Sequence, residues 1–172
     1  MSEEMTTELS EGITQRDKYM TFKSGNEYFA IGIEYINEII PFQRITVIPE
    51  TESYIKGLIN LRGKIIPVVD VALRFNQPPL EYNDRTCIIV IDVKATVVGL
   101  IVERIAEVVT IEEEDILPPP SIGRSNKVQN KYVYGIGKTG DCVKLLLDLD
   151  KFLHDEDSSI AEQADSFAEL EE

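Results

Sequence analysis

The sequence predicts an all-β fold, a sandwich or barrel, and three observations support this prediction. Short runs rich in Val, Ile, Tyr and Phe recur about every ten residues between two polar ends. Groups of Gly, Pro, Asn, Asp and Ser, the residues that favour turns, separate these runs. The 172 residues are 43% hydrophobic, which is enough for one compact domain or two small barrels with a shared core. About nine or ten strands are expected.

The first predicted hairpin lies at the start of the apolar region. Residues 18–23 and 27–33 flank Ser24-Gly25-Asn26, a turn sequence. In the second of these strands Phe29, Ile31 and Ile33 alternate, so they are expected on one buried face. A brief helical or irregular piece is expected to follow over 34–38.

A second hairpin is predicted from residues 55–60 and 64–70, which flank Leu61-Arg62-Gly63. Gly63 can take the left-handed conformation that a tight turn requires. Pro67 has no N–H to donate to a ladder, so its strand is expected at a sheet edge or at a bulge.

The rest of the apolar region continues the same pattern. A loop contains Gln77-Pro78-Pro79, and an acidic loop ends in Pro118-Pro119-Pro120. The remaining predicted strands are 86–92, 96–102, 108–111, 132–137 and 142–147, and a short helix is predicted near 150–154.

Charge is concentrated at the two ends of the chain. Of the formal net charge of -14, residues 1–17 carry five acids and one base, and residues 155–172 carry eight acids and no Lys or Arg. The body therefore carries only -2 and has no basic face for phosphates, which argues against nucleic-acid binding. Both acidic ends are expected to be flexible tails, although Ile160, Ala164 and Phe167 have the spacing of a weak amphipathic helix.

Several features predict a cytoplasmic protein that does not insert into a membrane. The longest apolar runs, 87–91 and 97–102, are far shorter than the roughly 20 residues of a membrane-spanning helix. The N-terminus is acidic where a secretory signal is basic and then apolar. Cys87 and Cys142 each lie in an apolar run and are expected to be reduced thiols of the core.

A search for catalytic groups finds little. The one histidine, His154, ends a predicted helix, and no phosphate-binding loop or metal-binding Cys/His pattern is present. Residues 112–115 and the pair Asp148 and Asp150 could bind a divalent cation, although an acidic loop and a helix start also explain them. The sequence predicts a non-enzyme without cofactor or metal, and the alternative is a small metal-dependent enzyme that uses these carboxylates.

Two polar positions stand out as candidates for binding. Arg62 lies on a hairpin turn, where its guanidinium could form bidentate hydrogen bonds to a partner, or could simply be a solubilising turn residue. Glu38 lies between Ile36 and Ile39, where it could mark the edge of an interface or be a surface charge. The residue types alone leave both alternatives open.

The order of several motifs resembles the CheW family of chemotaxis coupling proteins. The most specific is Lys56-Gly57 followed by Asn60-Leu61-Arg62-Gly63 and then Ile66-Pro67-Val68-Val69-Asp70. The other matching stretches are 28–31, 36–39, 98–102 and 116–118. The resemblance covers residues 18–154, which are taken as one CheW-like domain with two barrel subdomains.

The resemblance implies a fold, a function and a set of partners. Members of this family fold as two intertwined five-stranded SH3-like barrels around a shared hydrophobic core, with short helices. They are non-catalytic adaptors that couple the cytoplasmic tip of chemoreceptors to the regulatory domain of a CheA-type histidine kinase, at membrane receptor arrays. A role in a related pathway, twitching motility or surface sensing, is the alternative.

The resemblance also implies which residues bind. The receptor-facing groove, between the two barrels, would include Ile36, Glu38, Asn60 and Arg62. A kinase contact would use the segment from Leu117 to Ile122. Three successive prolines in that segment depart from the family pattern.

Overall fold

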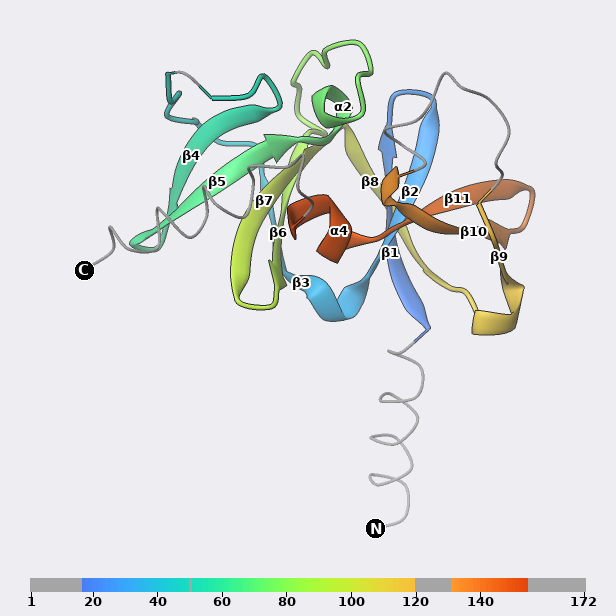
Figure 1. The fold of residues 1–172 in the computed structure, drawn as a ribbon. Coiled ribbons are helices and arrows are strands. Elements are labelled where there is room, and N and C mark those ends of the chain that lie inside the picture. The colour runs from blue at the N-terminus through green and yellow to red at the C-terminus, as the bar shows by residue number, and fades with distance from the viewer. Residues whose placement is uncertain (1–16, 50, 120–130, 155–172) are drawn as a thin grey trace.

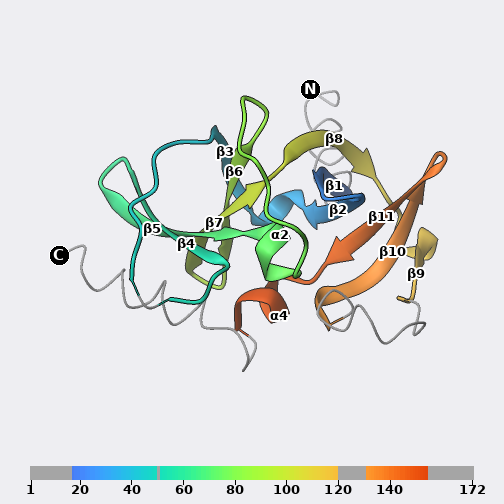
Figure 2. The same ribbon diagram turned by 90° about the horizontal axis from the view of Figure 1, so that it is seen from above.

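The structure is a computed structural model, and it describes residues 17–49, 51–119 and 131–154. Two sheets lie side by side, with α4 (Leu149–His154) between them (Figures 1 and 2). The six-stranded sheet has the order β8-β1-β2-β11-β10-β9, and the five-stranded sheet has the order β3-β6-β7-β5-β4. The expected acidic tails lie outside the described residues.

The bounds of the elements follow the chain through both sheets. The strands of the six-stranded sheet are β1 (Lys18–Ser24), β2 (Glu27–Gly32), β8 (Arg104–Thr110), β9 (Ile116–Leu117), β10 (Val133–Thr139) and β11 (Cys142–Leu147). Those of the five-stranded sheet are β3 (Ile36–Pro41), β4 (Ile55–Leu61), β5 (Lys64–Asp70), β6 (Cys87–Val93) and β7 (Thr96–Val102). The short helices are η1 (Ile33–Tyr35), α2 (Val71–Arg74) and η2 (Glu113–Asp115).

The two sheets are intertwined because the chain leaves the first sheet and returns to it. It begins with β1 and β2, builds the whole five-stranded sheet with β3 to β7, and comes back as β8 to β11. Strand β11 then pairs in parallel with β2, which joins the two ends of the described body. This arrangement confirms the predicted all-β, two-barrel fold, with β9 as a sixth strand where five were expected.

A shared hydrophobic core fills the space between the sheets. Phe22 and Phe29 of the first sheet, Leu100 of the second and Phe152 of α4 are all fully buried in it. A series of aromatic contacts crosses this core: the rings of Phe29 and Phe75 stack with centroids 5.0 Å apart, and those of Phe75 and Phe152 are 5.9 Å apart. The two sheets are therefore held together by one apolar cluster.

Alternate residues of the central strands also face a second core inside the five-stranded sheet. In β6, Ile89 and Ile91 face the shared core, whereas Ile88 and Val90 face this smaller core. Both faces of the strand are covered, so both kinds of position are apolar. This explains the uninterrupted apolar runs of β6 and β7, which an alternating, half-exposed strand would not have.

Several local expectations need correction. Ile33 belongs to η1 and not to a strand, and β3 begins where an irregular piece was expected. Pro67 lies in β5, which pairs with β4 on one side and β7 on the other, so it is not in an edge strand. Its missing N–H costs nothing, because the opposite residue Leu58 exchanges its hydrogen bonds with Thr46, and the pairing of β5 with β7 begins only at Val68.

The expectation of two core thiols is half wrong. Cys87 is partly buried and packs against the shared core, but Cys142 is exposed at the first position of β11. Both are free thiols. Cys142 directly follows the Gly140-Asp141 turn. At this end of β11 the side chains are still exposed, although the strand sequence is apolar.

Asp70, the last residue of β5, has a structural role that supports a stability prediction. Its carboxylate is buried, accepts a hydrogen bond from the Leu73 N–H at the start of α2, and accepts another from the Tyr82 hydroxyl. Asp70→Ala removes the helix cap and leaves the tyrosine hydroxyl unpaired, so it is expected to cost about 2 kcal/mol of unfolding free energy. Urea denaturation measures the loss.

Asp70→Asn is the matched control, because its side-chain oxygen can still cap α2. We expect it to lose about half as much unfolding free energy as the alanine variant. An asparagine variant as unstable as the alanine variant would show that the charge, and not the cap, is what the fold needs.

Candidate site on the five-stranded sheet

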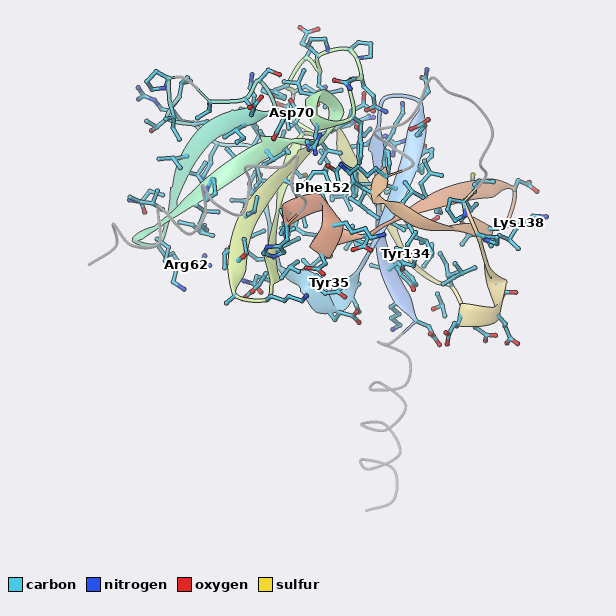
Figure 3. The ribbon with its side chains drawn as sticks, in the orientation of Figure 1. Tyr35, Arg62, Asp70, Tyr134, Lys138 and Phe152 are labelled. Carbon is cyan, nitrogen blue, oxygen red and sulfur yellow. The ribbon has the colours of Figure 1, made fainter. Side chains whose placement is uncertain are left out.

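Arg62 lies at the tip of the β4–β5 hairpin, which projects away from the six-stranded sheet (Figure 3). Arg62 and Gly63 form the two-residue turn, with φ values of 52° and 88°. Both central residues thus have positive φ, as type I′ hairpin turns require. The Asn60 side-chain oxygen accepts a hydrogen bond of 2.9 Å from the Gly63 N–H, which braces the turn.

The Arg62 side chain pairs with Glu38 of β3. Its Nη1 donates to Oε1 of Glu38 at 3.1 Å, and its Nη2 donates to Oε2, so the contact is bidentate. Glu38 comes close because β3 bulges between Ile36 and Glu38, where its register with β6 shifts. The pair connects β3 with the β4–β5 hairpin, although β3 and β4 are the opposite edges of the sheet.

The pair remains open to solvent. The side chain of Arg62 is 70% exposed and that of Glu38 is 29% exposed. Hydrogen bonds from Arg62 lower the pKa of the Glu38 carboxyl, and those same bonds raise the pKa of the guanidinium. The two bonds use only two of the five N–H donors that an arginine carries, so the exposed guanidinium can bond further groups.

A hollow of about 310 Å³ lies beside the pair. Glu38, Arg62, Lys64 and Asp92 supply its charged walls, and its apolar walls are Leu61, Ile66, Val90 and Val97. All of these residues belong to strands of the five-stranded sheet or, in the case of Arg62, to its β4–β5 turn. The hollow is therefore part of one barrel, whereas the resemblance implies a groove between the two.

The other expected site residues lie around this hollow or away from it. Asn60 is exposed, but its side chain is occupied in bracing the turn. Ile36 is partly buried and packs against the shared core, whereas its neighbour Ile39 on β3 is exposed. The structure thus brings Glu38, Asn60 and Arg62 together and turns Ile36 inward.

Sequence reasoning missed two charged residues of the hollow, Lys64 and Asp92. Lys64 directly follows the turn, and its position beside Arg62 was a usable signal. Asp92 reaches the hollow only because β6 pairs with β3, with Ile91 opposite Ile36. No local pattern indicates that pairing.

The expected kinase-contact residues lie elsewhere. Leu117 is 57% exposed on β9, which pairs with Ile136 and Gly137 of β10 in the six-stranded sheet. Ile122 lies outside the described residues. Leu117 and Arg62 thus belong to different sheets.

The carboxylate clusters have local partners in the structure. Asp148 accepts a hydrogen bond from the Lys151 N–H in α4, and Asp150 pairs with Lys94 at 3.0 Å. The Glu114 side chain raises the pKa of Glu112, first through a hydrogen bond between the two side chains and then through the negative charge of Glu114. Over residues 17–49, 51–119 and 131–154, no group of three or more His, Cys, Asp or Glu residues is arranged to hold a metal ion.

Within the same part of the chain, every helix is too short or too polar to span a bilayer.

The ion pair leads to a titration prediction. Arg62 lowers the pKa of Glu38, so removing the guanidinium in Arg62→Ala should move the Glu38 midpoint upward, toward an ordinary glutamate. In the wild type the carboxylate should lose its pairing only as the pH falls through this lowered pKa. NMR titration of the Glu38 side-chain carboxyl carbon measures both midpoints, and identical midpoints would show that the pair does not form in solution.

Comparisons with known proteins agree with one another. The family model of the CheW-like domain matches residues 18–157. The chemotaxis protein CheW of Klebsiella aerogenes is 31% identical over 151 residues, which cover 88% of this chain and 90% of the relative. The chemotaxis protein CheW of Helicobacter pylori is 32% identical over 155 residues, which cover 87% and 92%.

A solved structure gives the same result. The scaffolding protein TtCheW from Thermoanaerobacter tengcongensis superposes with a TM-score of 0.73 at 34% sequence identity, covering 81% of this chain and 94% of that chain. These matches confirm the resemblance inferred from the motifs: the chain belongs to the CheW-like family of chemotaxis proteins.

Proposed function

We propose that this chain is a non-catalytic adaptor that couples chemoreceptors to a CheA-type histidine kinase. The single observation that best supports a binding role is the exposed Glu38–Arg62 pair on a braced hairpin turn. A planar guanidinium held in one place can recognise a carboxylate or carbonyl groups of a partner without ordering a flexible side chain first. We assign this surface to the cytoplasmic tip of the receptor.

A second surface is assigned to the regulatory domain of the kinase. It includes the exposed Leu117 on β9, and the family resemblance adds Ile122, which lies outside the described residues. An adaptor needs two separate surfaces, and the surfaces at Arg62 and Leu117 lie on different sheets of one body with a shared core. Holding both partners on one body raises the effective concentration of the kinase at the receptor.

This mechanism requires no chemistry from the chain itself. If the adaptor binds the receptor and kinase more tightly in one signalling state, binding shifts the kinase equilibrium by that difference in affinity. The protein would act in the cytoplasm and be recruited to receptor arrays at the membrane. Its receptor-binding residues would be Glu38, Asn60 and Arg62, with Ile36 supporting the strand from the core side.

Reconstitution tests the proposal. Receptor signalling fragments arrayed on vesicles, the kinase and labelled ATP are mixed with and without this chain. We expect kinase phosphorylation to respond to the receptor only when the chain is present, and the chain itself to remain unlabelled. A kinase rate that is the same with and without the chain contradicts the coupling role, and stoichiometric labelling of the chain contradicts the non-catalytic one.

A further inference from the structure

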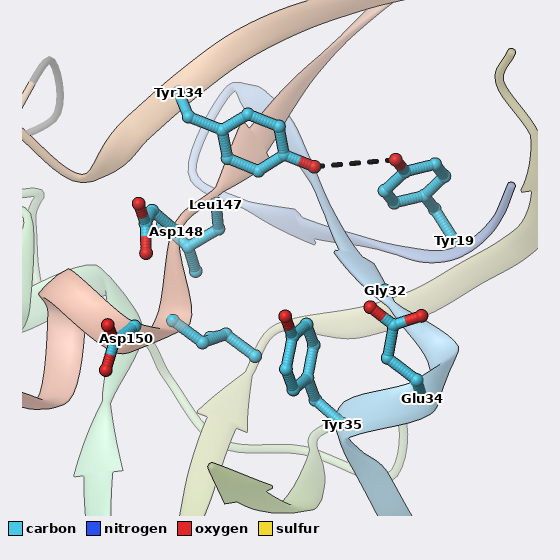
Figure 4. A pocket seen from close by; sticks show the side chains of 9 residues that line it. Tyr19, Gly32, Glu34, Tyr35, Tyr134, Leu147, Asp148 and Asp150 are labelled. Carbon is cyan, nitrogen blue, oxygen red and sulfur yellow. Dashed lines mark hydrogen bonds between the residues drawn. The ribbon is translucent and has the colours of Figure 1, made fainter. Parts of the chain in front are cut away.

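A second hollow, of about 360 Å³, lies beside the junction where β2 passes through η1 into β3. Its walls come from Tyr19 of β1, from Glu34 and Tyr35 of η1, from Tyr134 of β10, and from the β11–α4 junction, residues 147–150 (Figure 4). None of these residues lines the Arg62 hollow. We call it the tyrosine pocket.

Three tyrosines give the tyrosine pocket an aromatic lining. Tyr35 is 38% exposed and Tyr134 is 45% exposed, so both rings are accessible from solvent. The hydroxyls of Tyr134 and Tyr19 point toward each other, 3.5 Å apart, at the limit of a hydrogen bond that Tyr134 would donate (Figure 4). Aromatic faces carry partial negative charge and attract organic cations.

Three carboxylates add full negative charge to the same walls. In Figure 4, Asp148 and Asp150 lie on one side of Tyr35 and Glu34 lies on the other. Burial first, and then the charges of these three carboxylates, raise the pKa of Tyr35. The three carboxylates in the lining give the pocket a negative potential that favours a cation.

Nearby cations neutralise only part of this charge. Lys94 pairs with Asp150 at 3.0 Å, but both side chains are largely exposed, and such surface pairs are weak. His154 lies 3.9 Å from the same carboxylate. Among the described residues, the carboxylates of Glu34 and Asp148 form no ion pair with Lys, Arg or His, although Asp148 also caps α4.

We propose that the tyrosine pocket binds the guanidinium of an arginine side chain presented by a partner protein. A divalent metal fits less well, because the carboxylates stand apart around the rings and do not form a cluster that could ligate one ion in the described residues. A guanidinium is weakly hydrated, stacks on aromatic faces and donates to carboxylates in its plane, so it matches all three kinds of group in the pocket. The site adds a third contact surface to the adaptor and is separate from the two assigned above.

A titration of the full chain with a small probe tests the assignment. The probe is the peptide acetyl-Gly-Arg-Gly-amide, and the control is its citrulline analogue, which keeps the shape and loses the charge. We expect saturable NMR shifts at Tyr19, Tyr35 and Tyr134 with the arginine peptide. The citrulline peptide should bind at least about fivefold more weakly. Shifts spread over all acidic segments, or equal affinity for the two peptides, would overturn the proposal.

Charge-matched variants separate the pocket from general attraction to an acidic protein. Glu34→Gln with Asp148→Asn removes two pocket charges, and asparagine can still cap α4. The matched control is Glu113→Gln with Glu114→Gln, which removes two exposed charges from η2. The pocket variant is expected to weaken the arginine peptide about fivefold while the control leaves its affinity unchanged.

Equal weakening by both variants would assign the binding to net charge and overturn the site. Tyr35→Ala provides an independent readout, because it removes an aromatic face without changing charge. It should also weaken the peptide, and wild-type affinity in that variant would contradict the role of the rings. No receptor or kinase is present in these titrations, so their outcome does not depend on the proposed adaptor function.

Discussion

Replacing Gly57 with alanine is expected to destabilise the protein by about 3 kcal/mol. Gly57 has a φ of 146°, and a Cβ built there would lie only 2.1 Å from the carbonyl oxygen of Thr46. Thr46 and Leu58 exchange two backbone hydrogen bonds, each 2.8 Å long. Because the clash is with backbone and not with a flexible side chain, an alanine must push these two segments apart.

The position of this bridge explains why the effect should be large. Thr46 follows β3, one edge of the five-stranded sheet, and Leu58 lies in β4, the other edge. The bridge therefore closes the sheet into a barrel around its own small core. It lies on the same strand that carries Arg62 at its end, so opening it should also loosen the hairpin.

Gly63→Ala is the matched control for this prediction. Gly63 also has a positive φ, 88°, but no atom lies within 4 Å of a Cβ built there. Only the backbone conformation is then strained, which should cost about 1 kcal/mol. Chemical denaturation of both variants gives the two values, and equal losses would show that the close approach to Thr46 contributes nothing.

The hairpins could be predicted from sequence because their signals are local. Residues 24–26, 61–63 and 139–141 combine turn-forming residues with flanking apolar strands, and each produces a hairpin in the structure. Strand β3 was missed because its sequence has no such signal. It is a strand because it pairs with β6, about fifty positions further along the chain.

The candidate site, too, could be predicted only where its signals are local in the sequence. The turn residues at the Arg62 tip are readable from the motif, and so is the exposure of the guanidinium. The pairing with Glu38 is not, since it depends on a bulge in β3 and on the closing of the sheet across the Thr46–Leu58 bridge. The inward turn of Ile36 follows from the same bulge, which separates its side chain from that of Glu38.

The sequence predicts a left-handed backbone conformation for Gly63 alone, and it does not indicate that Arg62 adopts one too. Arg62 has a φ of 52°, uncommon for a residue with a long side chain. Glycine or asparagine would adopt this conformation at less cost. Lys94 and Ala95 at the β6–β7 turn adopt the same conformation, with φ values of 51° and 68°, so a positive φ alone does not mark a functional side chain. What distinguishes Arg62 is its exposed, bidentate pairing with Glu38.

Arg62→Glu is expected to weaken binding to a receptor signalling fragment about a hundredfold, and Arg62→Ala about tenfold. The alanine variant loses the guanidinium, and the glutamate variant also places two carboxylates together, since it faces Glu38. Binding to the kinase should stay unchanged in both, because we assign that contact to the surface at Leu117. Titration of the labelled fragment and of the kinase regulatory domain measures both affinities.

The double variant Glu38→Arg with Arg62→Glu decides whether Arg62 acts by contact or as a brace. It restores an ion pair between the same two positions, so the denaturation midpoint should return close to that of the wild type. If Arg62 touches the receptor, this swapped pair presents the wrong charge at each position, and receptor binding should remain weak. Arg62→Lys refines the answer: it keeps the charge but loses the planar fork, so weak binding there would support bidentate recognition. Full recovery of receptor binding in the swapped variant would show that the pair only holds the hairpin against β3, and that the receptor binds elsewhere.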